Sequence, residues 1–441
     1  SYISGVRIDY LSPTIYLTDV LIFVLLILVF IKSFKNSIVK SLKKNRTLVK
    51  HLLIITGFII INVLLSKSIL PSLYGAVKLF ECIFFALFTF FKIKKIKTET
   101  LLTIFSTGII FESLLSIAQY IRQESLGGIF YFLGERTFSG LTPGIANVSI
   151  NGELILRSYG TFSHPNVLAG FLLIILTYIL FNLNFKKIIT SFYLCAVILG
   201  TVALLFTFSR IAILFWMLSV FVYVFSKIPP RARLARLAAK RAFGGKPRTH
   251  DLTVGELGSI VSHFFVNPRS DERGIVVRGK SDFKYKISLL SILVLTVLVS
   301  FIFYSPFYLR FIQSSFFEDA VVVREKLIIS GFEQFLKNPV AGTGLNNYFS
   351  NVVMRGSVFV FQPVHNIFLL TLIQTGIVGF CYLIWILYKT FKSVIKDKSL
   401  YLKLIFFYII LIGLFDHYFL TLQQGQLLFA FFMGVFLSKH D

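Results

Sequence analysis

Apolar residues dominate this chain in windows of about 20 residues that are separated by short polar gaps. A helix of that length spans the hydrocarbon core of a bilayer, where every backbone group must be hydrogen-bonded within the chain. The pattern therefore predicts an all-α polytopic membrane protein. Eleven spans are predicted, near residues 14–33, 50–68, 73–92, 100–121, 165–184, 187–208, 210–227, 286–307, 365–388, 399–416 and 421–438.

Lysine and arginine are concentrated in every second gap. The basic runs KSFKNSIVKSLKKNRTLVK, KIKKIK, FKK and KTFKSVIKDK follow the first, third, fifth and ninth spans. Positively charged loops stay on the cytoplasmic side of a bilayer, so these gaps are predicted to face the cytoplasm. The long, less basic loops at residues 122–164 and 308–364 are then predicted to face the outside, the second of them between spans eight and nine.

Composition agrees with this interpretation. The 441 residues are 56% hydrophobic, and a mean hydropathy of +0.80 is far above that of a soluble domain. The net charge of +25 also suits nucleic-acid binding, but the basic residues lie between the spans, which favours membrane topology instead. The three cysteines lie inside apolar windows and have neither disulfide nor metal-ligand spacing.

Two features concern the organisation of the chain. An eleven-span protein starts outside and finishes inside, and this one begins SYISGV without Met, so we expect a preceding twelfth span. We divide the chain into spans one to seven (1–227), an Arg/Ala-rich cytoplasmic segment (228–285) and spans eight to eleven (286–441). The middle segment, centred on residues 229–280, is either a foreign or engineered insertion or a native loop whose RARLARLAAKRAF run lies on the inner leaflet.

Four charged or ionisable residues lie on the predicted outer face. They are Arg157 just before the fifth span, Arg210 in a tight turn between two spans, Arg324 in the loop at 308–364 and His365 at the start of the ninth span. Each of these residues, taken alone, is also explained by a purely structural role. An arginine at a helix end commonly extends to lipid phosphates, and a histidine beside a loop hydrogen-bonds to a nearby carbonyl. Arg210 is the exception, since positive residues are usually kept out of short outer turns. The presence of all four on one face favours a site.

The chemistry of these residues suggests a transfer reaction. Guanidinium groups pair bidentately with phosphate oxygens and stay charged at low dielectric, so three arginines suit a pyrophosphate-linked lipid. A neutral imidazole at His365 could take a proton from an attacking hydroxyl. We therefore predict that the arginines stabilise charge on a leaving pyrophosphate while the histidine activates the acceptor.

Other polar residues give weaker signals. Asp416 and His417, in GLFDHYFL, are ionisable at membrane depth and rank as supporting residues behind His365. His164 is a further supporting residue that either contributes to the site or caps a helix, and the second role is favoured because Pro165 after it is predicted to occupy the first turn of a helix. There is no outer acidic pair, no Cys/His cluster and no phosphate-binding GxxxxGK[ST] loop, so we expect no bound metal, no cofactor and no ATP-driven pump.

The motifs resemble those of the O-antigen ligase and O-antigen polymerase superfamily, bacterial membrane glycosyltransferases that use undecaprenyl pyrophosphate donors. HNIFLLTLIQTG matches the pattern H-[NSD]-x-x-L-x-x-x-x-x-x-G through His365, Asn366, Leu369 and Gly376. RSYGTFSHPNVLAG, FSR and REKLIISGFEQFLKNPVAGTGLNNY resemble the other motifs, so the likeness runs in order from residue 157 to 380. No counterpart of the Arg/Ala-rich segment is recognised.

The resemblance implies that His365 activates the acceptor hydroxyl and that Arg157, Arg210 and Arg324 hold the lipid pyrophosphate, with Asn366 in support. It also implies twelve spans and a metal-independent, inverting transfer on the outer face of the bacterial cytoplasmic membrane. The acceptor stays open: lipid A core for a ligase of lipopolysaccharide biosynthesis, a second lipid-linked repeat for a polymerase, or a protein side chain for an O-oligosaccharyltransferase.

Two other classes of function are weighed against this one. A polysaccharide or lipid transporter would show internal repeats and broken helices that converge at mid-membrane, and no such repeat is evident. A purely structural scaffold is disfavoured by the cost of placing so many charges at bilayer depth.

Overall fold

The computed structural model describes residues 2–3, 6–7, 13–33, 46–150, 152–183, 189–227, 319–351 and 362–438. The chain divides into two units, residues 1–216 with 299–441 and residues 217–298. Of the second unit, only residues 217–227 are described, and they are the last turns of α9 (Arg210–Lys227). All contacts discussed below lie within the first unit.

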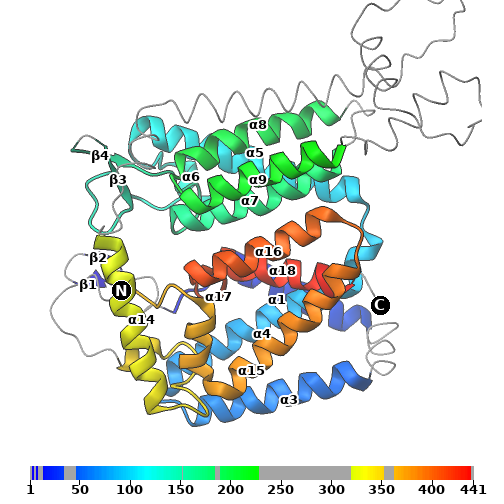
Figure 1. The fold of residues 1–441 in the computed structure, drawn as a ribbon, viewed down its shortest axis with the longest axis vertical. Helices are drawn as coiled ribbons and strands as arrows, with labels where there is room; N and C mark the ends of the chain where they lie inside the picture. The colour runs from blue at the N-terminus through cyan, green and yellow to red at the C-terminus, as the bar shows by residue number, and fades with distance from the viewer. Residues whose placement is uncertain are drawn as a thin grey trace, which may run out of the picture. The chain divides into compact units, whose positions relative to one another are not determined.

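Helices occupy most of the described chain (Figure 1). Each predicted span within the described residues coincides with a helix, whereas the span at 286–307 lies outside them. The main helices are α1 (Leu17–Ser33), α3 (Arg46–Leu64), α4 (Ile69–Lys92), α5 (Thr98–Arg122), α7 (Pro165–Asn182), α8 (Thr190–Phe206), α9, α14 (Asp319–Lys337), α15 (Ile367–Lys396), α16 (Leu400–Phe415) and α18 (Gln423–Ser438).

Three helices, α5, α7 and α15, are long and apolar enough to cross a membrane, and shorter apolar stretches occur in α1, α3, α8, α9 and α16. Many large apolar side chains on α1, α3 and α4 are exposed, as expected where helices face lipid tails. The protein is therefore a helical membrane protein. The number of spans and their orientation stay predictions.

The centre of the first unit is α7, which packs against α5, α8, α16 and α18. Nearly all of its side chains from Val167 to Leu180 are buried, so it is apolar on every face. Pro165 occupies its first turn, as predicted, because the missing N–H costs nothing there.

Short elements depart from the all-α expectation. Residues Tyr2–Ile3 (β1) pair with Val6–Arg7 (β2), and Asn147–Ile150 (β3) pair with Glu153–Leu156 (β4) as an antiparallel hairpin. The second hairpin lies within the loop predicted at 122–164. This hairpin ends at Leu156, directly before Arg157. The hairpin therefore helps to fix the position of Arg157 beside the helices.

α15 is interrupted at Gly376, where the backbone turns to φ 62° and ψ −168°. The chain that follows α14 fills the break, because Thr343 N donates to the Ile373 carbonyl (2.9 Å) and Ile377 N donates to the Pro339 carbonyl (2.9 Å). A β-carbon at position 376 would overlap the Val340 carbonyl. The glycine of the HNIFLLTLIQTG motif therefore lets a loop cross a membrane helix at close range.

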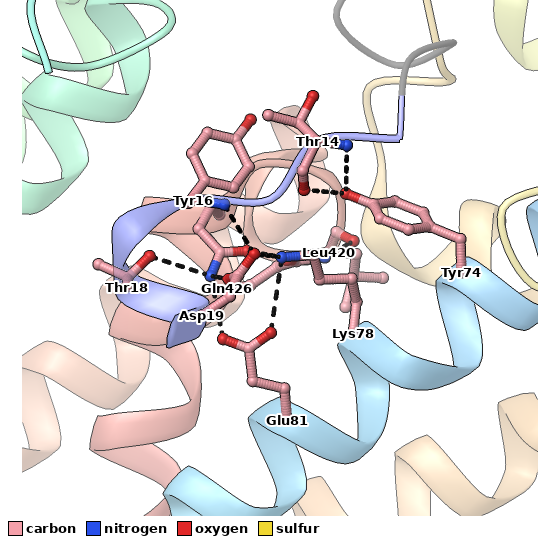
Figure 2. Close-up of polar contacts among 10 residues, drawn as sticks. Thr14, Tyr16, Thr18, Asp19, Tyr74, Lys78, Glu81, Leu420 and Gln426 are labelled. Carbon is pink, nitrogen blue, oxygen red and sulfur yellow. Dashed lines mark hydrogen bonds and ion pairs between the residues drawn. The ribbon is translucent and has the colours of Figure 1, made fainter. Parts of the chain in front are cut away.

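A buried ionic network joins α1, α4 and α18 (Figure 2). Lys78 on α4 forms ion pairs with Asp19 of α1 and with Glu81 (3.5 Å), and it donates to Oε1 of Gln423 at the start of α18 (3.0 Å). Nε2 of Gln423 donates in turn to Glu81 (3.1 Å). Buried charges at membrane depth are costly unless paired, and here each of them has a partner. The network fixes the first turn of α18 against α1 and α4.

Candidate functional site

Three ionisable side chains meet where α15 begins and α16 ends. His365 stands two residues before α15, and Asp416 and His417 follow α16 directly. The metal-binding atoms of these three residues lie within 4.8 Å of one another, and the two imidazole centroids are 4.9 Å apart. Asp416 and His417, which the sequence ranked behind His365, therefore lie beside it.

Local capping explains why the chain brings these residues together. Asn366 caps α15, because its Oδ1 accepts from Phe368 N and Leu369 N, both at 2.9 Å. Its Nδ2 donates to the Leu414 carbonyl (3.2 Å), which joins the start of α15 to the last turn of α16. The motif residue next to His365 thus holds two helix ends in register.

Hydrogen bonds orient Asp416 and His417. Oδ1 of Asp416 accepts from the His417 backbone N–H (2.8 Å), and Oδ2 accepts from Nδ2 of Asn166 (3.0 Å). Nδ1 of His417 lies 2.7 Å from Oγ1 of Thr421, one helical turn further on. Nδ1 of His365, by contrast, is buried and has no hydrogen-bond partner within the described part of the chain. An imidazole nitrogen donates or accepts a hydrogen bond according to its tautomer, so this atom is available for either role.

Arg157 is connected to this group through Asn166. Nη2 of Arg157 donates to Oδ1 of Asn166 (2.7 Å), whose amide nitrogen reaches Asp416. His164 caps α7, with its Nδ1 accepting from Asn166 N (3.1 Å). The structural role predicted for His164 agrees with this contact, and the residues of RSYGTFSHPN form one side of the site.

The FSR turn packs against the same segment. Nε of Arg157 donates to the Thr207 carbonyl (2.7 Å), and Ser158 N donates to the Phe206 carbonyl (3.0 Å). The Tyr120 ring stacks on Phe206 with centroids 4.0 Å apart. Arg210, the first residue of α9, follows this turn and is half-buried. Two motifs that are about 50 residues apart in sequence are neighbours in space.

Arg324 approaches from α14, which packs along the first part of α15. A β-carbon at Gly331 of α14 would lie 3.0 Å from Cδ1 of Ile373, which shows how closely the two helices pack. The Arg324 guanidinium is near enough to His365 and His417 to act on both imidazoles electrostatically. The structure therefore brings Arg157, Arg324 and His365 to one cluster, with Arg210 at the turn beside Arg157.

The protonation states follow from burial and from these charges. Burial is the main cause that lowers the pKa of His365, and Arg324 lowers it further, although Asp416 opposes both. Burial likewise lowers the pKa of His164 and of His417 to about 3. For Asp416, burial favours the neutral acid, but the surrounding histidines outweigh it and hold the pKa below its usual value. Neutral imidazoles thus surround an ionised carboxylate at neutral pH.

His365, Asp416 and His417 are also a donor set that could hold a metal ion. Zinc ligands at about 2.1 Å from the ion stand about 3.4 Å apart in a tetrahedral site, and the three ligand atoms here lie within 4.8 Å of one another. The Arg324 guanidinium acts electrostatically on both histidines of this set and opposes a dication. The set thus has the ligand types of a metal site with a positive charge beside it, and the absence of a metal stays a prediction.

Several residues that the sequence analysis did not single out support this site. Glu112 and Gln119 lie inside the predicted span at 100–121, and they bind the segment that precedes α7. Nη1 of Arg136 donates to the Ser163 carbonyl (2.7 Å), next to His164. The signal for Glu112 and Gln119 was present, because two polar residues seven positions apart lie on one face of an otherwise apolar helix.

The fold and the cluster define a helical membrane protein with a site of two half-buried histidines, one buried histidine, a carboxylate and arginines near its helix ends. Residues 261–384 match the family model described as O-antigen ligase. This match confirms the resemblance to the O-antigen ligase and polymerase superfamily, and it contains Arg324 and His365. It also overlaps residues 261–285 of the Arg/Ala-rich segment, for which the motifs gave no counterpart. No curated protein and no solved structure matches the chain.

Proposed function

We propose that this membrane enzyme of the O-antigen ligase and polymerase type transfers a glycan from undecaprenyl pyrophosphate to an acceptor hydroxyl at the outer face of the bacterial cytoplasmic membrane. The observation that carries the proposal is the environment of His365. Burial lowers the pKa of its imidazole, its Nδ1 has no hydrogen-bond partner within the described residues, and the Asp416 carboxylate and the Arg324 guanidinium are near enough to act on it.

The reaction follows from these groups. His365 takes the proton of the acceptor hydroxyl while that oxygen attacks the anomeric carbon from the face opposite the pyrophosphate. The bond between the anomeric carbon and the pyrophosphate oxygen breaks, and the configuration inverts. Arg157, Arg210 and Arg324 bind the pyrophosphate and stabilise its growing charge, which is the part that a metal plays in other transferases. Asp416 stabilises the imidazolium that forms.

The interruption in α15 favours an enzyme over a transporter. Broken helices in transporters expose backbone carbonyls that coordinate ions. Here the Ile373 carbonyl accepts from Thr343 N, and the Gln374 carbonyl accepts from Gly344 N (3.0 Å) and from Nδ2 of Asn62 (3.1 Å). The carbonyls on this side of the break are thus occupied by the protein itself, and the break supports packing rather than ion binding.

A transfer assay with purified protein tests the proposal. The substrates are a glycan on undecaprenyl pyrophosphate and, in separate reactions, lipid A core, a second lipid-linked repeat and a peptide that contains serine and threonine. We expect one acceptor to gain the glycan, with an equal amount of undecaprenyl pyrophosphate released and the anomeric configuration inverted. The acceptor that reacts separates a ligase from a polymerase and from a protein glycosylating enzyme.

A chelator arm tests the metal-free mechanism separately. EDTA should leave the rate unchanged if arginines alone stabilise the leaving group. Activity that is lost in EDTA and restored by a divalent cation would contradict this mechanism. Failure of transfer to every acceptor would contradict the proposed function itself.

A further inference from the structure

The six residues between Arg157 and His164 are held by side chains of α5. No residue of α5 takes part in the reaction proposed above. Residues 158–163 have no regular secondary structure, yet Tyr159 is 2% exposed and Ser158 is 0% exposed. An irregular segment can be buried only where its backbone polar groups find partners. Gln119 and Glu112 of α5 supply the partners of four of these groups.

Gln119 binds the middle of the segment. Its Oε1 accepts from Tyr159 N (3.2 Å) and from Gly160 N (2.8 Å), and its Nε2 donates to the Gly160 carbonyl (3.0 Å). The same Nε2 donates to Oε1 of Glu135 (2.8 Å). Gln119 is fully buried, and both ends of its amide are satisfied.

Glu112 binds the next residue along the segment. Its Oε2 accepts from Thr161 N (2.9 Å), and its Oε1 accepts from Oγ1 of Thr161 (2.6 Å). Gly160 has φ +57°, and a β-carbon there would overlap Oε2 of Glu112. The segment therefore turns at its glycine directly over the carboxylate.

The two residues belong to one face of α5. Glu112, Ser116 and Gln119 are spaced by four and three positions, and the Ser116 carbonyl accepts from Oγ of Ser158 (2.9 Å). α5 is long and apolar enough to cross a membrane, and a carboxylate and an amide buried in such a helix are costly. Packing alone would be served better by apolar residues. The polar face is complementary to the backbone of residues 158–161, which points to a positioning role.

We propose that Glu112 and Gln119 are positioning residues for donor binding. By fixing residues 158–163, they set Arg157 where it meets Asn166, and they hold His164 as the cap of α7. This inference rests on the proposed function, because Arg157 is the residue that would bind the pyrophosphate. Disturbing the segment should weaken donor binding while leaving acceptor binding intact.

The test compares Glu112→Ala with Glu112→Gln in the purified full chain. Glutamine keeps both contacts, since its Oε1 can accept from Thr161 N and its Nε2 can donate to Oγ1 of Thr161. We expect Glu112→Ala to raise the KM for the donor roughly tenfold, as for the loss of buried hydrogen bonds, with the acceptor KM unchanged. Glu112→Gln should stay within about threefold of the wild type. Ser113→Ala on the same helix is the matched control.

A double variant shows whether the effect passes through Arg157. If Glu112 acts by positioning that guanidinium, adding Glu112→Ala to Arg157→Ala should raise the donor KM no further. Additive effects would overturn the inference, as would a Glu112→Gln variant as defective as Glu112→Ala or an equal rise in the KM of both substrates.

Binding of undecaprenyl pyrophosphate gives a readout that does not depend on transfer. The lipid should raise the Tm of the wild type and of Ser113→Ala more than that of Glu112→Ala or Gln119→Leu. Equal shifts in all four proteins would overturn the positioning role. A wild type that binds the lipid but transfers no glycan would instead count against the proposed function alone.

Discussion

At the scale of single residues, the site combines three histidines with one carboxylate. A base must be unprotonated to act, and burial together with Arg324 lowers the pKa of His365, which keeps its imidazole neutral. Asp416 counteracts the effect of burial at His365 and would stabilise the charged form once the proton has moved. Asp416 and Arg324 thus shift the pKa of His365 in opposite directions, and substituting each of them in turn separates the two effects.

The pH dependence of transfer should report these influences. Transfer needs neutral His365, so kcat/KM should fall as the pH drops through a pKa that is lowered from 6.5. Arg324→Leu removes a positive charge and raises that pKa, so the acidic limb of the residual activity should move to higher pH. Asp416→Asn removes the opposing charge and should move the limb to lower pH. Limbs that do not move, or that move in the same direction, would argue against His365 as the titrating base.

At the scale of elements, the site depends on how loops cross helices. The spacing from His365 to Gly376 is visible in the sequence, and so is the Pro-Asn start of α7. The close contact between Gly376 and Val340 was not predictable, because it forms only when the chain after α14 packs against α15 in the folded protein. Glu112 and Gln119 were overlooked because a span is predicted from the mean hydropathy of a window, and a few polar residues change that mean little.

The crossing at Gly376 predicts a strong effect of a small substitution. Gly376→Ala adds a β-carbon against the Val340 carbonyl at a positive φ, so the loop must shift and the protein should lose about 1–3 kcal/mol of stability. Gly108→Ala on α5 meets no atom within 4 Å and is the matched control. Thermal unfolding in detergent should show a lower Tm for Gly376→Ala only. An unchanged Tm would mean that the break in α15 is not maintained by the glycine.

At the scale of the whole molecule, the sequence was most informative about helices. Their positions were confirmed within the described residues, because long apolar windows leave the backbone few other solutions in a bilayer. The β3–β4 hairpin was missed, since a short polar ladder in a loop has no comparable signal. The proximity of Asp416 and His417 to His365 depends on how the helices pack, so it cannot be predicted from the sequence of a single segment.

Orientation in the membrane is the prediction at this scale. The charge bias places residues 122–164 outside and the gap after α15 inside. In a background without the native cysteines, Leu141→Cys should react with a membrane-impermeant maleimide in intact cells, since Leu141 is 93% exposed. Lys398→Cys, in the short exposed gap between α15 and α16, should react only after permeabilisation. The reverse pattern would place the site on the cytoplasmic side.

The proposed mechanism is tested most directly by the transfer rate of His365→Ala with saturating donor and acceptor. Loss of a general base predicts a fall in kcat of roughly 10²–10⁴-fold, with normal membrane expression and an unchanged donor KM. His51→Ala is the matched control, because His51 packs against Trp385 of α15. It should retain the wild-type rate. Wild-type turnover by His365→Ala would contradict the proposal that this histidine activates the acceptor.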